Sequence, residues 1–482
     1  MIIDKLSPIA LCLGLAVAGS MVGCKKKGGD SKNPDNKELK DAGNAEVPDE
    51  QAKAQFAEAY EAYETAKSDG SLSAAECERV AKTFQEVYES NKRSMLVARF
   101  NVGALWEECG DMEKAAKVYQ ELGDKNFHLA LNNLGVIAWN KGDTKKALDL
   151  FKKSVDADKK QAFAARNNLA AAHRDRYADK VSQEDFEIAE KQIQNVLAVD
   201  TSNKAAYENL ARLYYDRGRL KDPSYLVLAN LVVTQAIRVL EKDKQDSADI
   251  RNLQGLLFMQ QDNQIDALKA FKKAVSIDAN HADANRNIGF IAIRFRDYPT
   301  AEKAFDTALK DASVKRDIEV YIAMGVAKRG LKKFTEAEEW YRKAMEIDKK
   351  DPRPWYNLAV LNQDHLVGQD DVDQTKLEAF YKTAQEHCGK FMKMAEGNKK
   401  YADAYADCVD RDAIIKDTFE TFKVMAELEK KAKELEALEK KQEEERRKRL
   451  LEMEQQAAAA GEESPMEAQE AAADAEGGEG GE

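Results

Sequence analysis

A set of fixed intervals, repeated along the chain, restricts the fold more than any other feature of the sequence. In five segments a Gly is followed by Ala after twelve residues and by Phe or Tyr four residues later. These segments are Gly103/Ala115/Tyr119, Gly135/Ala147/Phe151, Gly255/Ala267/Phe271, Gly289/Ala301/Phe305 and Gly325/Ala337/Tyr341. Looser versions occur at Ala170/Ala189/Ile193, Ala211/Ala229/Val233 and Ala359/Leu377/Tyr381. The sequence therefore predicts eight copies of one structural unit.

The spacing of apolar residues from Phe56 onward is helical, and only 8 Pro and 25 Gly occur among 482 residues. So few turn-forming residues argue against a sandwich or barrel of short strands. Small residues at fixed positions let two helices cross closely, and we expect the aromatic residues to fill the gap to the next unit. A single unit cannot bury its apolar stripe alone, so the units should stack into an all-α solenoid.

The pattern resembles the tetratricopeptide repeat (TPR), a pair of antiparallel helices of about 34 residues. The resemblance covers roughly residues 96–387 and implies eight TPR-like repeats that bind protein partners in a groove. We expect residues 51–95 to form a degenerate helical pair that caps the solenoid.

Three repeats are longer than the others. The interval of twelve residues becomes 19 from Ala170 to Ala189. It becomes 18 from Ala211 to Ala229 and from Ala359 to Leu377. We expect these insertions to form loops at one edge of the solenoid. They either lie near a binding face or are surface loops without a role.

The N-terminus is typical of an export signal, with Lys5 followed by an apolar stretch from Leu6 to Val17. Residues 21–24, Met-Val-Gly-Cys, resemble the bacterial lipoprotein cleavage motif, in which the Cys is acylated. This resemblance implies a signal peptide over residues 1–23 and a lipid on Cys24. An ordinary secretory peptide with a chance Cys is the alternative.

The segment after Cys24 is polar up to residue 50, so residues 24–50 are expected to form a flexible tether. Lys25 stands where an Asp favours retention in the inner membrane of some bacteria. We therefore expect a periplasm-facing lipoprotein of the cell envelope, in the outer membrane rather than the inner one.

The repeats fade after Cys388, and residues 388–457 are predicted to form a helical hairpin that turns at Gly397 and continues as a long charged helix. An apolar stripe on this helix is expected to cover the last repeat; it consists of Ile415, Phe419, Phe422, Met425, Leu428, Leu435 and Leu438. Residues 439–449 contain no apolar side chain, so this part should project into solvent or form a short coiled coil with a partner.

Residues 458–482 are predicted to be a disordered acidic tail. The tail beyond residue 460 holds eight acidic residues and no Lys or Arg, and the whole chain has a formal charge of -12. The body is therefore close to neutral, and no concentrated basic face supports nucleic-acid binding.

The sequence offers little for catalysis. None of the five His stands at metal-ligand spacing with a second His, Cys or paired acid, and no phosphate-binding loop or serine elbow occurs. The acidic segment at Asp370, Asp371 and Asp373 lacks the Gly and terminal Glu of an EF-hand. We therefore expect no enzyme activity, no metal, no cofactor and no small-molecule substrate.

Four Cys remain in the mature body, which suggests two disulfides in an exported protein. Cys388 and Cys408 lie at equal distances from Asn398, so an antiparallel hairpin would bring them level. Cys77 and Cys109 are expected at the same edge of neighbouring helices. The alternative is buried free thiols that act as small hydrophobic groups.

An Asn recurs one residue before the Leu-Gly or Leu-Ala pair of most repeats. The set comprises Asn101, Asn133, Asn168, Asn209, Asn287 and Asn357, with Asn252 close to register. In some TPR proteins such a ladder holds an extended polypeptide, because an amide can donate to a C=O and accept from an N–H. Alternatively, these residues only bond neighbouring backbone.

Together these features predict a lipid-anchored, non-catalytic adaptor that holds extended segments or envelope-complex subunits in its groove. Signal, tether, repeats, charged helix and acidic tail together resemble the TPR lipoproteins of adventurous gliding-motility machinery. A pilotin-like factor for outer-membrane assembly and an accessory subunit of a periplasmic enzyme are the alternative functions.

Overall fold

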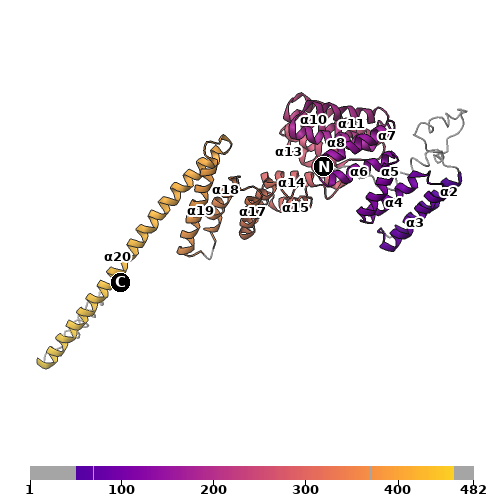
Figure 1. The fold of residues 1–482 in the computed structure, drawn as a ribbon. Helices are drawn as coiled ribbons and strands as arrows, with labels where there is room; N and C mark the ends of the chain where they lie inside the picture. The colour runs from indigo at the N-terminus through magenta and orange to yellow at the C-terminus, as the bar shows by residue number, and fades with distance from the viewer. Residues whose placement is uncertain (1–49, 69, 370–371, 461–482) are drawn as a thin grey trace, which may run out of the picture. The chain divides into compact units, whose positions relative to one another are not determined.

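The computed structural model describes residues 50–68, 70–369 and 372–460. The predicted signal peptide, the lipid site at Cys24, the tether and the acidic tail lie outside the described residues. The described chain divides into two compact units, one ending at Lys315 and the other beginning at Arg316. Each unit is built from helices, as the sequence predicts (Figure 1).

The first unit is a solenoid of antiparallel helix pairs. Its helices are α2 (Glu50–Ala66), α3 (Ala74–Ser90), α4 (Leu96–Glu108), α5 (Met112–Gly123), α6 (His128–Asn140), α7 (Thr144–Ala157), α8 (Phe163–Lys180), α9 (Gln183–Leu197), α10 (Lys204–Leu220), α11 (Ser224–Lys242), α12 (Ala248–Gln260), α13 (Gln264–Ile277), α14 (Ala282–Arg294) and α15 (Tyr298–Ala308). The first helices of successive repeats contact one another directly from α6 through α8 and α10 to α12. This row of first helices forms one face of the solenoid.

We call the five repeats with the Gly/Ala/aromatic set the glycine repeats. In them the ring of the second helix lies directly against the glycine of the first: a Cβ added to Gly135 would meet a ring carbon of Phe151 at 2.5 Å, and one at Gly255 would meet Phe271 at 2.5 Å. Each ring therefore occupies the space that a side chain at the glycine position of the same repeat would need. Phe271 also packs in one core cluster with Ile288 of the next repeat, so the ring serves both contacts.

The turns of the Gly103 and Gly135 repeats end in Asp N-caps. The Asp111 and Asp143 side chains accept hydrogen bonds from backbone N–H groups three residues later, at the starts of α5 and α7. Gly110 and Gly142 precede them with φ of +82°, a conformation that favours glycine. The Gly-Asp dipeptide thus ends one helix and starts the next.

We call the repeats that begin at Ala170, Ala211 and Ala359 the alanine repeats. The first helices α8 and α10 have 18 and 17 residues, whereas the first helices of the glycine repeats, such as α6, have 13. Only residues 181–182 separate α8 from α9, and residues 221–223 separate α10 from α11. The expectation of insertion loops is therefore wrong for these two repeats, because the extra residues lengthen the helices.

The lengthened helices bring aromatic residues together. Tyr177 at the end of α8 packs on Phe186 of α9 with ring centroids 5.5 Å apart, and Phe186 meets Tyr225 of α11 at 5.6 Å. The Arg217 guanidinium lies 4.0 Å from the centre of the Phe186 ring. This cluster joins the first two alanine repeats.

Helix α11 is the one described helix that is long and apolar enough to cross a membrane, judged by length and composition. Its residues Ala229, Val233, Ala236 and Leu240 are buried, because one side of the helix packs into the core of the first unit. The packing is that of an ordinary solenoid helix.

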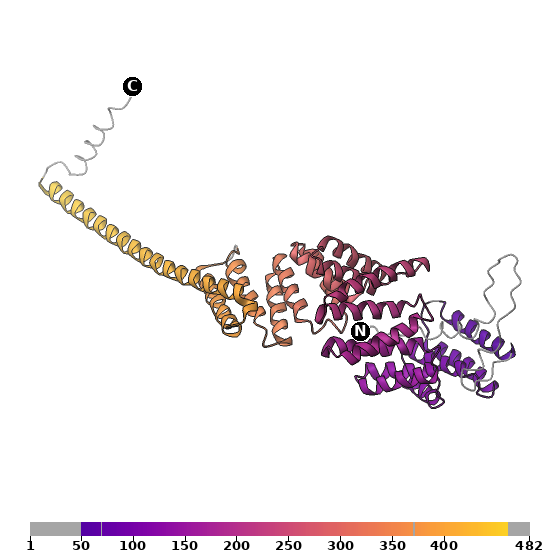
Figure 2. The same cartoon turned by 90° about the horizontal axis from the view of Figure 1, so that it is seen from above.

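The second unit contains α16 (Ile318–Gly330), α17 (Phe334–Ile347), α18 (Arg353–Val360), a π-helical segment (Leu361–Leu366), α19 (Gln374–Ala395), a short 3₁₀ turn (Lys399–Tyr401) and α20 (Ala402–Ala460). Helices α19 and α20 form a hairpin, beyond which α20 continues as a single rod (Figure 2). Cys388 of α19 is bonded to Cys408 of α20, with their Cα atoms 5.4 Å apart. In the first unit, Cys77 of α3 is bonded to Cys109 at the end of α4, with a Cα separation of 6.4 Å.

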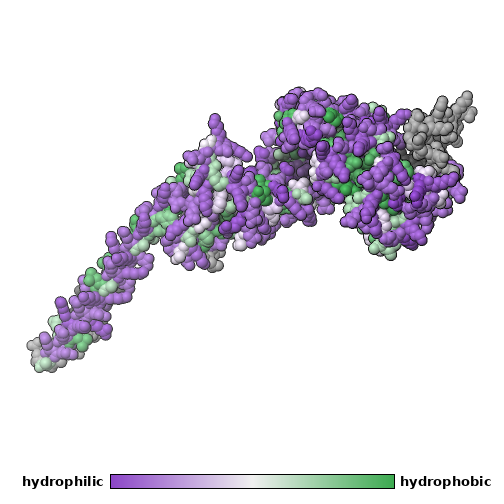
Figure 3. Space-filling model, viewed as in Figure 1, coloured by the Kyte–Doolittle hydropathy of each residue, from purple (hydrophilic) through white to green (hydrophobic). Residues whose placement is uncertain are grey.

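The apolar stripe of α20 is covered over only part of its length. Ile415 is fully buried, and Phe419 and Phe422 pack against Tyr381 of α19. The remaining stripe residues are 52–62% exposed; they are Met425, Leu428, Leu435 and Leu438. The expectation that the whole stripe covers the last repeat is therefore wrong, and the rod shows isolated apolar patches (Figure 3).

Candidate functional site

A polar groove on the first unit is the candidate functional site. It encloses about 540 Å³ and is lined by α8, α10, α12, the start of α14 and the turn after α15. Three of the predicted ladder residues line it, namely Asn168, Asn209 and Asn252. A volume of this size suits a short stretch of chain and not a folded domain.

The groove arises from residues at helical spacing on the inner face. Helix α8 contributes Asn168, Ala171 and Asp175, and α10 contributes Glu208 and Arg212, each three or four residues apart. These residues lie on the same side of their helices as the ladder residues Asn168 and Asn209. The position of each Asn therefore identifies the side of its helix that lines the groove. The sequence analysis singled out the amides and missed the charged residues one and two turns further on.

Neighbouring asparagines of the inner face bond one another across repeats. Asn168 Nδ2 donates to Asn132 Oδ1 at 2.9 Å, and Asn287 Nδ2 donates to Asn252 Oδ1 at 3.0 Å. Asn133 accepts from Asn132 at 3.2 Å. Part of the predicted ladder is therefore engaged within the solenoid itself, which links adjacent first helices.

Asn209 of α10 lines the groove and bonds α8 in two ways. Its Nδ2 donates to the backbone carbonyl of Asn167 at 3.2 Å, and its Oδ1 accepts from Arg174 at 2.7 Å. The guanidinium of Arg174 in turn contacts Asp175 at 2.7 Å. The amide of Asn209 and the carboxylate of Asp175 thus hold the Arg174 guanidinium in place.

Four of the seven predicted ladder residues do not line the groove, namely Asn101, Asn133, Asn287 and Asn357. Asn101 is fully buried on α4, and neither its Nδ2 nor its Oδ1 has a hydrogen-bond partner. Asn357 belongs to the second unit and donates to the Arg353 carbonyl one turn earlier at 3.0 Å. The bond of Asn357 matches the alternative in which these residues only bond nearby backbone.

Charged side chains dominate the groove lining. Eight of the lining residues are Asp or Glu, and two are Arg. Arg212 lies 3.1 Å from Asp216, which is 2% exposed. Burial lowers the pKa of Arg212, but the charges of Asp216 and Asp283 outweigh it and raise the net pKa above its usual value.

His281 occupies the N-cap of α14 at one end of the groove. Its Nδ1 accepts from the Ala284 backbone N–H at 3.1 Å, and its Nε2 lies 3.3 Å from Asp249 of α12. Burial alone would lower the pKa of His281. The hydrogen bond to Asp249 and the charge of Asp249 have the larger combined effect, so the pKa of His281 is raised above its usual value. For Asp249, burial alone would raise the pKa. The hydrogen bond and charge of His281 outweigh burial, so the pKa of Asp249 is lowered.

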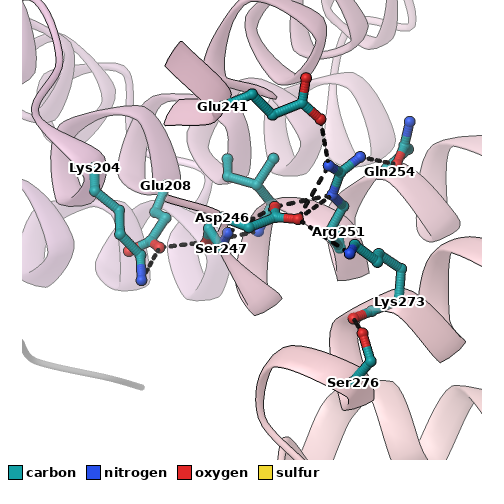
Figure 4. Close-up of polar contacts among 10 residues, drawn as sticks. Lys204, Glu208, Glu241, Asp246, Ser247, Arg251, Gln254, Lys273 and Ser276 are labelled. Carbon is teal, nitrogen blue, oxygen red and sulfur yellow. Dashed lines mark hydrogen bonds and ion pairs between the residues drawn. The ribbon is translucent and has the colours of Figure 1, made fainter. Parts of the chain in front are cut away.

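A second polar network fixes the turn behind Glu208. The Ser247 hydroxyl donates to Glu208, which also lies 3.8 Å from Lys204 (Figure 4). On the other side of this turn, Arg251 contacts Asp246 and Glu241, each at 2.9 Å. The two contacts hold the segment between α11 and α12 and keep Glu208 at the groove.

The described residues contain no group of three or more His, Cys, Asp or Glu side chains placed to hold a metal ion. Asp370 and Asp371, weighed above as a calcium site, lie outside the described residues. The groove offers amides, carboxylates and guanidinium groups for binding.

Comparison with known proteins identifies the repeats. Two family models, both described as tetratricopeptide repeat, match the chain, one at residues 248–281 and 318–351 and the other at residues 110–162 and 179–222. The chain therefore contains tetratricopeptide repeats. No curated protein matches the chain.

Several solved structures are similar to the chain. One, from a functional characterization of Pseudomonas aeruginosa pilF, shares 14% identity over 49% of this chain and 99% of its own, with a TM-score of 0.39. A thermophilic TPR protein of Thermus thermophilus shares 18% identity over 42% of this chain and 98% of its own, with a TM-score of 0.34. YrrB, described as a TPR protein with an unusual peptide-binding site, shares 17% identity over 43% and 96%, with a TM-score of 0.29.

Proposed function

We propose that this protein is a non-catalytic, lipid-anchored scaffold of a bacterial cell envelope that holds segments of partner proteins in the groove of its first unit. The observation that carries this proposal is the groove itself, in which Asn168, Asn209 and Asn252 line one continuous hollow. TPR domains in general mediate protein–protein interactions, and the groove offers the donors and acceptors that a polypeptide backbone requires.

The cellular setting of the proposal is supported by the N-terminal sequence. The signal-like stretch and the Met-Val-Gly-Cys tetrad ending at Cys24 support export and acylation, and the polar residues up to 50 suit a tether. The two disulfide pairs suit an oxidising compartment such as the periplasm. A role within gliding-motility machinery is the narrower form of this proposal.

Site-specific crosslinking in intact cells tests the proposal. A photo-crosslinking residue replaces Ala205, which lines the groove, and in a matched variant it replaces Lys272, which is exposed on α13 outside the groove. We expect discrete adducts in the envelope fraction from position 205 and none from position 272. Equal adducts from both positions, or none from either, would contradict groove binding.

The same cells test the anchor. With Cys24→Ser, we expect the protein and its adducts to move from the membrane fraction to the soluble periplasm. A variant that still sediments with membranes after a high-salt wash contradicts the lipid anchor. The identity of the adduct separates the alternatives, because motor components favour gliding motility, a secretin favours a pilotin-like factor, and a hydrolase favours an enzyme subunit.

A further inference from the structure

We infer that the groove of the first unit selects a partner segment rich in Lys or Arg. This inference rests on the proposed function and specifies the class of partner that the same groove takes. It is carried by the charge of the lining and by one buried amide oxygen.

The charge of the lining is strongly negative. The groove has six more carboxylates than guanidinium groups and contains no Lys. Both guanidinium groups are already matched, since Arg174 contacts Asp175 at 2.7 Å and Arg212 contacts Asp216 at 3.1 Å. The other six carboxylates come from α8, α10, α12 and the segments around α14 and α15. Asp249 contacts His281 and Glu208 accepts from Ser247, so the excess of negative charge, and not a free carboxylate, is what a ligand would meet. A concave site with low-dielectric walls concentrates such a field and attracts cations.

The buried amide belongs to Asn167, which lines the groove and is 5% exposed. Its Nδ2 donates to Asn203 at 3.0 Å and its backbone carbonyl accepts from Asn209, which fixes the side chain in place. Its Oδ1 has no hydrogen-bond partner. A buried acceptor without a donor is costly, so this oxygen is set to accept from an N–H group of a ligand.

Both observations require the same ligand chemistry. A Lys ammonium or an Arg guanidinium has only donors, and it can satisfy a carboxylate and an amide oxygen together. An acidic segment would meet like charge, and a neutral segment would leave the excess negative charge of the lining uncompensated. The Oδ1 of Asn168 and the Nδ2 of Asn252 are not used by the asparagine bonds between repeats, so they can bond the backbone of the bound segment.

The binding test uses a defined probe. Fluorescein-labelled peptides of about ten residues, in which Ala alternates with Lys, Glu or Ser, are titrated into the full mature protein and followed by anisotropy. We expect the Lys peptide to bind at least about tenfold more tightly than the Ser peptide, with an affinity that falls as salt increases. The Glu peptide should not bind. Equal affinity for the Lys and Ser peptides would overturn the inference.

Charge-matched variants locate the site. Asp179→Asn/Asp283→Asn removes two groove carboxylates, and Asp149→Asn/Asp156→Asn removes two from the exposed surface of α7. We expect the groove variant to weaken the Lys peptide about tenfold and the α7 variant to leave it unchanged. Equal losses in both variants would show a general charge effect and overturn the inference.

Two further outcomes separate the preference for basic segments from the proposal that the groove binds partner segments at all. If crosslinking at position 205 captures acidic or neutral segments, groove binding stands and the preference for basic segments fails. If the polyamine spermidine binds as tightly as the Lys peptide and displaces it, the groove recognises cations and not a polypeptide, which also overturns the inference. Circular dichroism of each variant verifies that the helices remain folded.

Discussion

The glycine repeats and the alanine repeats meet the same packing requirement with different side chains. In a glycine repeat such as that of Gly255, a Phe ring from the second helix fills the space above the glycine. In the first two alanine repeats the place of the Phe ring is taken by Ile193 and Val233, which are smaller. The place of the glycine is taken by Ala170 and Ala211, whose methyl groups fill part of the space. The volume between the helices is shared differently but is filled in both cases.

The aromatic residues of these alanine repeats have moved to the lengthened helix ends. Tyr177, Phe186 and Tyr225 pack there around Arg217. The additional turn of α8 also supplies Ala178 and Asp179 to the groove. The difference teaches that lengthening a repeat preserved its packing and extended the surface that lines the groove.

The largest effect should come from removing a ring that packs on glycine. Phe305 is fully buried above Gly289, so Phe305→Ala opens a void bordered by a residue that has no side chain. We expect a loss of about 3 to 5 kcal/mol in the free energy of unfolding, measured by urea denaturation. Phe295→Ala is the matched control, since Phe295 is 60% exposed and its loss should change stability by less than about 0.5 kcal/mol.

A double-mutant cycle sharpens the same test. An Ala at Gly289 would collide with the Phe305 ring, so Gly289→Ala alone should destabilise by about 1 to 3 kcal/mol. After Phe305→Val that collision disappears, and the pair should be coupled by about 1 to 2 kcal/mol. Additive effects would show that the ring and the glycine do not share one space.

Features confined to one repeat or one hairpin could be predicted from the sequence. The close approach of the two helices at Gly255 and Ala267 and the pairing of Cys388 with Cys408 depend on residue intervals within a short segment. The contact of each ring with the glycine of its own repeat was not foreseen, since the rings were expected to fill only the gap to the next repeat. Helix geometry turns such intervals directly into positions. The all-α solenoid follows from repeating them.

The insertions and the groove could not be placed in this way. The residues from Ala171 to Lys180 contain neither Gly nor Pro, so α8 continues through them and ends only at Lys180, and a loop was the wrong interpretation. The groove needs side chains from α8, α10, α12 and α14, and intervals within one repeat do not determine how successive repeats are rotated.

The expectation that α20 is covered along its whole apolar stripe was wrong for a related reason. Helix α19 has 22 residues and runs antiparallel to α20, so it reaches only the first part of the 59-residue helix. Phe422 still meets Tyr381, while Met425 is 62% exposed. A stripe shows which side of a helix is apolar, and the length of the partner decides how much of it is covered.

An intermediate effect is expected in the third alanine repeat, where a buried histidine packs against a tryptophan. His387 of α19 is 7% exposed. Its ring packs at a tilt against Trp355 with the ring centroids 5.4 Å apart, and its Nδ1 has no hydrogen-bond partner. Burial, with the charges of Lys390 and Arg342, lowers the pKa of His387 from 6.5 to about 4. The unfolded chain therefore takes up a proton at a pH where the folded chain does not.

Stability should accordingly be full above pH 6.5 and fall as the pH decreases toward 4. We expect a loss of about 1 to 3 kcal/mol from this residue across that window, seen as the difference between wild type and His387→Phe in urea titrations. His387→Phe keeps a ring on Trp355 and removes the titration. Parallel pH profiles for the two proteins would show that His387 does not control the acid sensitivity of this repeat.

The smallest effect concerns the additional turn of α8, and its sign is opposite. Asp179 is exposed one residue before the end of the helix, where the helix dipole disfavours negative charge, and Asp175 lies one turn earlier. Asp179→Asn should therefore raise the free energy of unfolding by about 0.3 to 0.5 kcal/mol, measured by urea denaturation beside Asp149→Asn on α7. If Asp179→Asn instead destabilises the protein, the additional turn serves packing, and its contrast with the glycine repeats disappears. A small gain in stability together with weaker binding of the Lys peptide would mean that this carboxylate opposes folding slightly and acts on the groove, as expected if the alanine repeats are lengthened for partner binding.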